Sequence, residues 1–136
     1  MMLPFIPLRA CAGITGFESP AAEYTELRLT LDQILIDDPA ATYLGFVEGT
    51  SMKGVGIFPN DILVVSRAET VINGDVIVAT LNGGFVCKIA DIKQKRLVSS
   101  SPGCKDYQLS EGDEFIIEGV VTRSVRFHRP LKRGLF

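Results

Sequence analysis

The sequence predicts one small, mostly β domain, built as a curled β-sheet or partly open barrel with a flexible N-terminal arm and one short helix. Short runs of β-branched and aromatic residues follow one another at close spacing from residue 42 onward. Turn residues separate these runs, and only one stretch has the spacing of a helix. Hydrophobic residues make up 46% of the 136 residues, which is enough for the core of one domain. We expect an arm over residues 1–29 and a β-rich domain with a basic C-terminal tail over residues 30–136.

The start of the chain is rich in alanine, glycine and proline and has no sustained period of 2 or 3.6, which indicates an arm. A short helix is expected next. Thr30 is its predicted N-cap, and Gln33 completes a capping box three residues later. We expect Asp38-Pro39 to end this helix, because proline disfavours helical backbone in the residue before it.

Six strands are expected after the helix, at residues 43–47, 62–65, 76–81, 85–89, 96–99 and 115–125. The second run is continuously apolar, so we expect it to be buried on both faces. Asn82-Gly83 separates the third run from the fourth, and Asn-Gly between two β-rich runs is the strongest short signal for a hairpin. Pro59-Asn60 marks another turn, because proline sets its backbone dihedral in advance.

The charge balance argues against a nucleic-acid-binding protein. The formal net charge is −2 and the pI is about 5.4, so the chain as a whole lacks a basic footprint. No pair of helices remains for a helix-turn-helix, and we expect no sequence-specific DNA binding. One basic cluster crowds the C-terminus, where a solvated tail is the usual interpretation. Its members are Arg123, Arg126, Arg129, Lys132 and Arg133.

The cysteines and the histidine do not indicate a metal centre. Cys11, Cys87 and Cys104 are odd in number and far apart, and His128 is the only histidine. A structural zinc site needs about four suitably spaced ligands, so neither a metal nor a cofactor is expected. A scattered, odd set also argues against a secreted disulfide framework. The chain lacks the apolar runs of a signal peptide or a membrane helix, so we expect a cytoplasmic protein.

Lys88 is unusual on its predicted strand, because it shares one face with Val86 and Ala90. Apolar neighbours desolvate an ammonium group and favour its neutral form, which is how a lysine becomes a general base. The other interpretation is an edge-strand lysine that points to water and guards against aggregation. Taken alone, the strand favours this second interpretation.

Ser51 lies in the stretch Gly49-Thr50-Ser51-Met52, directly after a predicted strand. Nucleophiles are often carried on loops that leave a rigid sheet, although most serines in glycine-rich loops are only loop residues. A Ser–His–Asp arrangement is disfavoured because His128 lies in the basic tail. A cysteine nucleophile has no histidine placed for it.

Six segments match a known family, and one of them contains the Ser-Met pair while another contains the strand lysine. They are residues 39–43, 49–52, 59–65, 73–79, 85–88 and 118–121. From Ser19 to about Arg126 the chain resembles the UmuD- and LexA-type family of self-cleaving serine–lysine peptidases. The resemblance implies that Ser51 is the nucleophile, that Lys88 is its general base, and that the backbone N–H groups of Thr50 and Ser51 hold the oxyanion.

The resemblance also implies that the substrate is the arm of the protein itself, cut before a glycine and after a small residue. Two bonds qualify, Ala12-Gly13 and Thr15-Gly16. Alignment of the following residues favours the second. Residue chemistry favours the first, because threonine is branched and stiff at Cβ. We predict cleavage at Ala12-Gly13, in an arm that is shorter than is usual in the family.

By the same resemblance, the trigger would be a RecA filament on single-stranded DNA. The cleaved homodimer would serve a Y-family translesion polymerase in the SOS response to DNA damage. The apolar end, Leu135-Phe136, is a candidate contact for a sliding clamp. LexA-like repression would need a DNA-binding domain, and a signal peptidase would need a membrane anchor. We expect neither feature in this sequence, so both alternatives are disfavoured. The main alternative is a non-catalytic β-barrel interaction module in which Ser51 and Lys88 are incidental.

Overall fold

The structure is a computed structural model, and it describes residues 30–130. The predicted arm, with both candidate cleavage bonds, lies outside the described residues, as does the end of the basic tail. The chain divides into two compact units, Met1–Asp37 and Asp38–Phe136. Within the first, the described element is helix α1, Leu31–Leu35.

Helix α1 begins with the predicted capping box. The Gln33 N–H donates to Thr30 Oγ1 at 3.1 Å, and the Thr30 N–H donates to Gln33 Oε1 at 2.9 Å. The helix ends at Leu35, before the Asp38-Pro39 pair. Asp38 instead caps the 3₁₀ turn Pro39–Ala41, where its carboxylate accepts from the Ala40 N–H at 3.1 Å.

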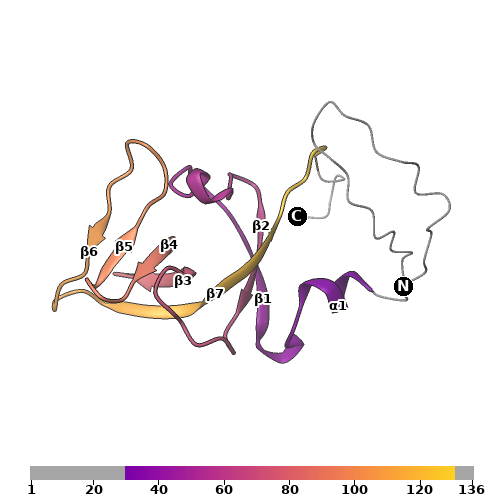
Figure 1. The fold of residues 1–136 in the computed structure, drawn as a ribbon, viewed down its shortest axis with the longest axis horizontal. Coiled ribbons are helices and arrows are strands. Elements are labelled where there is room, and N and C mark those ends of the chain that lie inside the picture. The colour runs from indigo at the N-terminus through magenta and orange to yellow at the C-terminus, as the bar shows by residue number, and fades with distance from the viewer. Residues whose placement is uncertain (1–29, 131–136) are drawn as a thin grey trace. The chain divides into compact units, whose positions relative to one another are not determined.

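The second unit is one open, antiparallel seven-stranded sheet in the order β1-β2-β7-β3-β4-β5-β6 (Figure 1). Its strands are β1 Thr42–Phe46, β2 Ile62–Ser66, β3 Val76–Leu81, β4 Gly84–Asp91, β5 Arg96–Val98, β6 Tyr107–Gln108 and β7 Phe115–Val125. The predicted mostly β fold with one short helix is therefore confirmed. All six predicted strands are present. The seventh strand, β6, was not predicted, because it is only two residues long.

Strand β7 holds the two halves of the sheet together. It is 11 residues long and pairs with β3 through its first part and with β2 through its last. The pairing with β3 shifts register between Gly119 and Ile117, and the pairing with β2 shifts between Arg123 and Val121. Gly119 has φ +155°. A Cβ on this residue would lie 2.6 Å from Val65 Cγ1, so only glycine fits. Irregularities of this kind bend a sheet, and here they accompany the curl.

The core forms two clusters, and the first one anchors the Ser51 loop. It consists of the buried residues Val47, Met52, Ile57, Leu63 and Val65. The second consists of Ile77, Ala79, Ala90, Leu97 and Val120. Val47, Met52 and Ile57 come from the connection between β1 and β2, so this connection is packed into the core. Leu63, Val64 and Val65 are all at most 3% exposed, which confirms the predicted burial of this strand on both faces.

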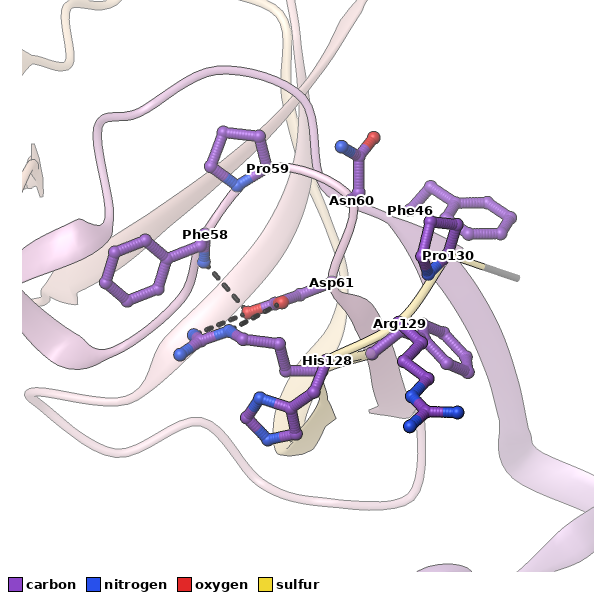
Figure 2. A pocket seen from close by; sticks show the side chains of 10 residues that line it. Phe46, Phe58, Pro59, Asn60, Asp61, His128, Arg129 and Pro130 are labelled. Atoms are coloured by element: carbon purple, nitrogen blue, oxygen red, sulfur yellow. Dashed lines mark hydrogen bonds and ion pairs between the residues drawn. The ribbon is translucent and has the colours of Figure 1, made fainter.

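An ion pair ties the turn before β2 to the end of β7. Asp61 is 2% exposed, and its carboxylate accepts from Arg126 Nε at 3.0 Å and Nη2 at 2.9 Å. The Phe58 N–H donates to the same carboxylate at 2.9 Å, and Figure 2 shows Asp61 between this turn and residues 128–130. Arg126 is thus paired with Asp61 although its side chain is 41% exposed, and Arg123 is half-buried within β7, so these two residues of the basic cluster do not belong to a free tail.

Candidate functional site

Ser51 sits on a loop that packs into the core directly after it. Gly49 before it has φ +81°, a left-handed conformation that glycine adopts without cost. Met52 after it is 2% exposed and lies in the first core cluster. A 3₁₀ turn, Lys53–Val55, follows. The half-exposed Ser51 side chain therefore lies directly before a residue that is buried in the core.

Lys88 lies on β4, opposite Ile77 of β3. The predicted alternation is observed, because Ala90 belongs to the second core cluster and Val86 packs against it, whereas Cys87 packs against the first. The Lys88 side chain is half-buried, and its Nζ donates to Ser99 Oγ at 2.9 Å. Lys88 is therefore not an edge-strand lysine that points only to water.

Ser51 and Lys88 line the same cavity, which has a volume of about 200 Å³. The cavity is bounded by Val47, Glu48, Gly49, Ser51, Met52, Phe85, Val86, Cys87 and Lys88. Its walls thus come from the loop after β1 and from the first half of β4. Within residues 30–130, no hydrogen bond joins the two side chains directly. The structure therefore brings together the two residues that the sequence singled out, from loci far apart in the chain.

The backbone beside Ser51 is oriented by a loop of three serines after β5. The Ser100 N–H donates to the Ser51 carbonyl at 2.8 Å, and Ser101 Oγ donates to the Thr50 carbonyl at 2.6 Å. Ser101 Oγ also accepts from the Lys53 N–H at 3.0 Å. In the described part of the chain, the N–H groups of Thr50 and Ser51 meet no acceptor. Two N–H groups in a fixed backbone next to a hydroxyl are what an oxyanion site requires.

A larger apolar groove of about 460 Å³ runs beside the cavity and shares part of its wall. The shared residues are Val47, Glu48, Phe85, Val86 and Cys87. The groove runs along β1 and along the first half of β4. Within residues 30–130, strand β1 pairs with β2 on one side, and β4 reaches β5 from Ile89 onward. A groove beside the edge of a sheet can take up an extended peptide as an added strand.

The other candidate groups are not arranged for catalysis. Burial raises the pKa of the Cys87 thiol to about 11, against a smaller opposing effect of Lys88, so the thiol is not an activated nucleophile. His128 lines a different hollow with Asp61 and Arg129, as Figure 2 shows. Among residues 30–130, no three His, Cys, Asp or Glu side chains are grouped to hold a metal ion. No described helix has the length and apolar character needed to cross a membrane.

Sequence reasoning missed the three serines, Ser99, Ser100 and Ser101, which contact both Lys88 and the Ser51 loop. The local signal was a polar run before Pro102-Gly103, which is typical of an ordinary turn. Only the pairing of β4 with β5 places this run next to Lys88.

The open β-sheet thus carries a loop serine and a strand lysine on the wall of one cavity. The family model described as Peptidase S24-like matches residues 4–122. Protein SamA from Salmonella typhimurium is 38% identical over 107 residues, covering 79% of this chain and 75% of SamA. Protein MucA from Escherichia coli is 34% identical over 130 residues, covering 93% of this chain and 86% of MucA.

A LexA repressor from Bordetella avium is 33% identical over 132 residues, covering 94% of this chain and 59% of the repressor. The chain therefore belongs to the Peptidase S24-like family, as a UmuD-type member of this group of self-cleaving serine peptidases.

Proposed function

We propose that Ser51 and Lys88 are the catalytic dyad with which this protein cuts its own N-terminal arm. The observation that carries the proposal is their shared cavity, with Ser51 on an anchored loop and Lys88 on the neighbouring strand. A neutral lysine takes the hydroxyl proton as Ser51 Oγ attacks the scissile carbonyl. The N–H groups of Thr50 and Ser51 stabilise the oxyanion, where each such donor contributes about 3 kcal/mol to the transition state.

The rest of the reaction follows from the same two side chains. Lys88 returns the proton to the leaving amine, which breaks the peptide bond and leaves the arm residue acylated on Ser51. Water then attacks the ester with Lys88 again as base, and Ser51 regains its proton. The apolar groove beside the cavity would hold the arm in an extended conformation along β1 and the first half of β4.

The proposed cleavage bond is Ala12-Gly13. The scissile carbonyl must lie about 3–3.5 Å from Ser51 Oγ, in a cavity of only about 200 Å³ with Val47, Met52 and Val86 in its wall. One methyl group suits this space better than the branched side chain of Thr15. The intact mass of the stable product separates a start at Gly13 from a start at Gly16. Gly13→Asp should block cleavage and Gly16→Asp should be much milder. A product that starts at Gly16, with Gly13→Asp cut normally, contradicts this choice.

The dyad is tested by incubating the purified protein at pH 7 to 10 and following fragment formation. Alkaline pH increases the neutral fraction of a lysine, so wild-type cleavage should accelerate. Ser51→Ala and Lys88→Ala should each abolish it. Lys93→Ala, which removes an exposed lysine just after β4, should leave it unchanged. Cleavage by Ser51→Ala rejects the nucleophile, and cleavage by Lys88→Ala at the wild-type rate rejects the base. No fragment from any form favours the interaction module.

The biological role that we propose rests on the relatives and on the family resemblance. Removal of the arm, stimulated by a RecA filament on single-stranded DNA, would produce the active accessory subunit of an error-prone Y-family translesion polymerase in the SOS response. The active form would be a cytoplasmic homodimer, and a sliding clamp is a further candidate partner for the apolar end of the tail. Addition of an activated RecA filament should accelerate fragment formation at neutral pH. No acceleration argues against this regulation while leaving the dyad intact.

A further inference from the structure

Ser99 occupies a position fixed by three hydrogen bonds. It follows β5 directly, where the register pairs Ile89 with Val98 and so sets Ser99 beside Lys88. The Ser99 N–H donates to Asp106 Oδ1 at 3.1 Å, and Ser99 Oγ donates to the Lys105 carbonyl at 3.3 Å. The same oxygen accepts from Lys88 Nζ at 2.9 Å. The hydroxyl group is thus positioned by the carbonyl of Lys105 in the same loop, and it accepts one hydrogen bond from Lys88.

The direction of these bonds determines what Ser99 can do for Lys88. A serine hydroxyl has a single proton, and here that proton is donated to the Lys105 carbonyl. Toward Lys88, Ser99 therefore acts only as an acceptor. A neutral amine that donates one N–H to Ser99 keeps its lone pair free, whereas a hydroxyl that donated to the amine would occupy that lone pair.

The next two residues position the other half of the site. Ser100 and Ser101 hold the carbonyls of Ser51 and Thr50, at 2.8 and 2.6 Å. Gly54 lies so close to the Ser100 carbonyl that a Cβ could not be placed there without a shift. Segment 99–101 therefore contacts both the loop that carries Ser51 and the side chain of Lys88.

We propose that Ser99 is a positioning residue for self-cleavage, which holds Lys88 Nζ by accepting its hydrogen bond and leaves the amine lone pair free for the Ser51 proton. The inference rests on the proposed function of Ser51 and Lys88 and adds a third side chain to it. Ser99 takes no proton and forms no covalent bond in the proposed reaction, so it acts through the position of the Lys88 amine.

Loss of the Ser99 hydroxyl should slow self-cleavage by about 10- to 100-fold, the range expected when a catalytic group is misplaced by about 1 Å. Threonine and valine have nearly the same shape, but only threonine has a hydroxyl group. Comparing Ser99→Thr with Ser99→Val therefore isolates the contribution of the hydroxyl. Ser99→Thr should stay within about threefold of the wild type, and Ser99→Val and Ser99→Ala should both be slow. Raising the pH to 10 should not restore either slow variant, because the defect is the position of the amine and not its protonation.

The experiment follows fragment formation from pH 7 to 10 in these variants, in the wild type and in Ser51→Ala. Ser110→Ala is the matched control, because it also removes an exposed hydroxyl hydrogen bond, to Asp113 Oδ2 at 3.1 Å. Circular dichroism shows whether each variant is folded. Ser99→Val at the wild-type rate, or Ser99→Thr as slow as Ser99→Val in folded proteins, overturns the positioning role alone. A wild type that does not cleave, or Ser51→Ala that does, overturns the dyad and this inference together.

Discussion

Replacing Asp61 by asparagine tests how strongly the turn before β2 is tied to the end of β7 (Figure 2). The carboxylate is 2% exposed and accepts two hydrogen bonds from Arg126 and one from the Phe58 N–H. Asparagine has almost the same shape but keeps only one accepting oxygen. Its NH₂ group is a donor and would face another donor where the second carboxylate oxygen now accepts. Hydrogen bonds to charged groups contribute about 1.5–3 kcal/mol each.

The expected loss is worked out from these contacts. About half of the accepted bonds disappear, and one buried donor loses its partner. The guanidinium of Arg126 is 41% exposed, so water recovers part of its loss. We expect the free energy of unfolding to fall by about 3 kcal/mol. With a urea m-value of about 1.5 kcal/mol per M, the unfolding midpoint moves down by about 2 M.

The effect has a predictable pH dependence. The hydrogen bonds from Arg126 hold the pKa of Asp61 below its ordinary value, against the opposing effect of burial. The stability that depends on the ionised carboxylate is therefore present above about pH 4 and is lost as the pH falls through the folded-state pKa. The difference between wild type and Asp61→Asn should be constant from pH 5 to 8 and shrink toward pH 2.

Urea unfolding is followed by far-UV circular dichroism, because the chain has no tryptophan. Glu111→Gln removes one exposed carboxylate elsewhere and serves as the charge-matched control. Its midpoint should stay within about 0.3 M of the wild type. A midpoint of Asp61→Asn within the same range, or a full difference that persists at pH 2, would refute the reasoning.

Two further predictions concern the site itself. Gly54→Ala should slow self-cleavage at least tenfold and cost about 1–3 kcal/mol of stability, because its Cβ collides with the Ser100 carbonyl; Gly112→Ala, which meets nothing within 4 Å, should match the wild type in both assays. Cys87, with its pKa raised to about 11, should react with iodoacetamide at pH 8 about 100-fold more slowly in the folded protein than in urea, and its rate should climb between pH 9 and 11. Mass spectrometry of a variant carrying Cys11→Ser and Cys104→Ser measures this rate, and fast labelling at pH 8 contradicts the burial argument.

Local sequence determined most of the secondary structure. The Thr30 and Gln33 capping box, the apolar run of β2 and the Asn82-Gly83 hairpin each depend on residues within a few positions of one another. The residue types drew attention to Ser51 and Lys88, but taken alone they favoured a loop serine and an edge-strand lysine, and the family resemblance supplied the expected catalytic roles. Short elements such as β6 were not predicted, since two residues carry no periodic signal.

The tertiary structure decided which of these groups meet. Pairing of β7 with both β2 and β3 curls the sheet, and this curl brings the loop after β1 to the first half of β4. The β4–β5 register then places Ser99 against Lys88, and the following residues against the Ser51 loop. Contacts of this kind come from hydrogen bonding and packing between distant strands. A polar run before a Pro-Gly turn therefore looked ordinary in the sequence and became part of the candidate site only in the folded chain.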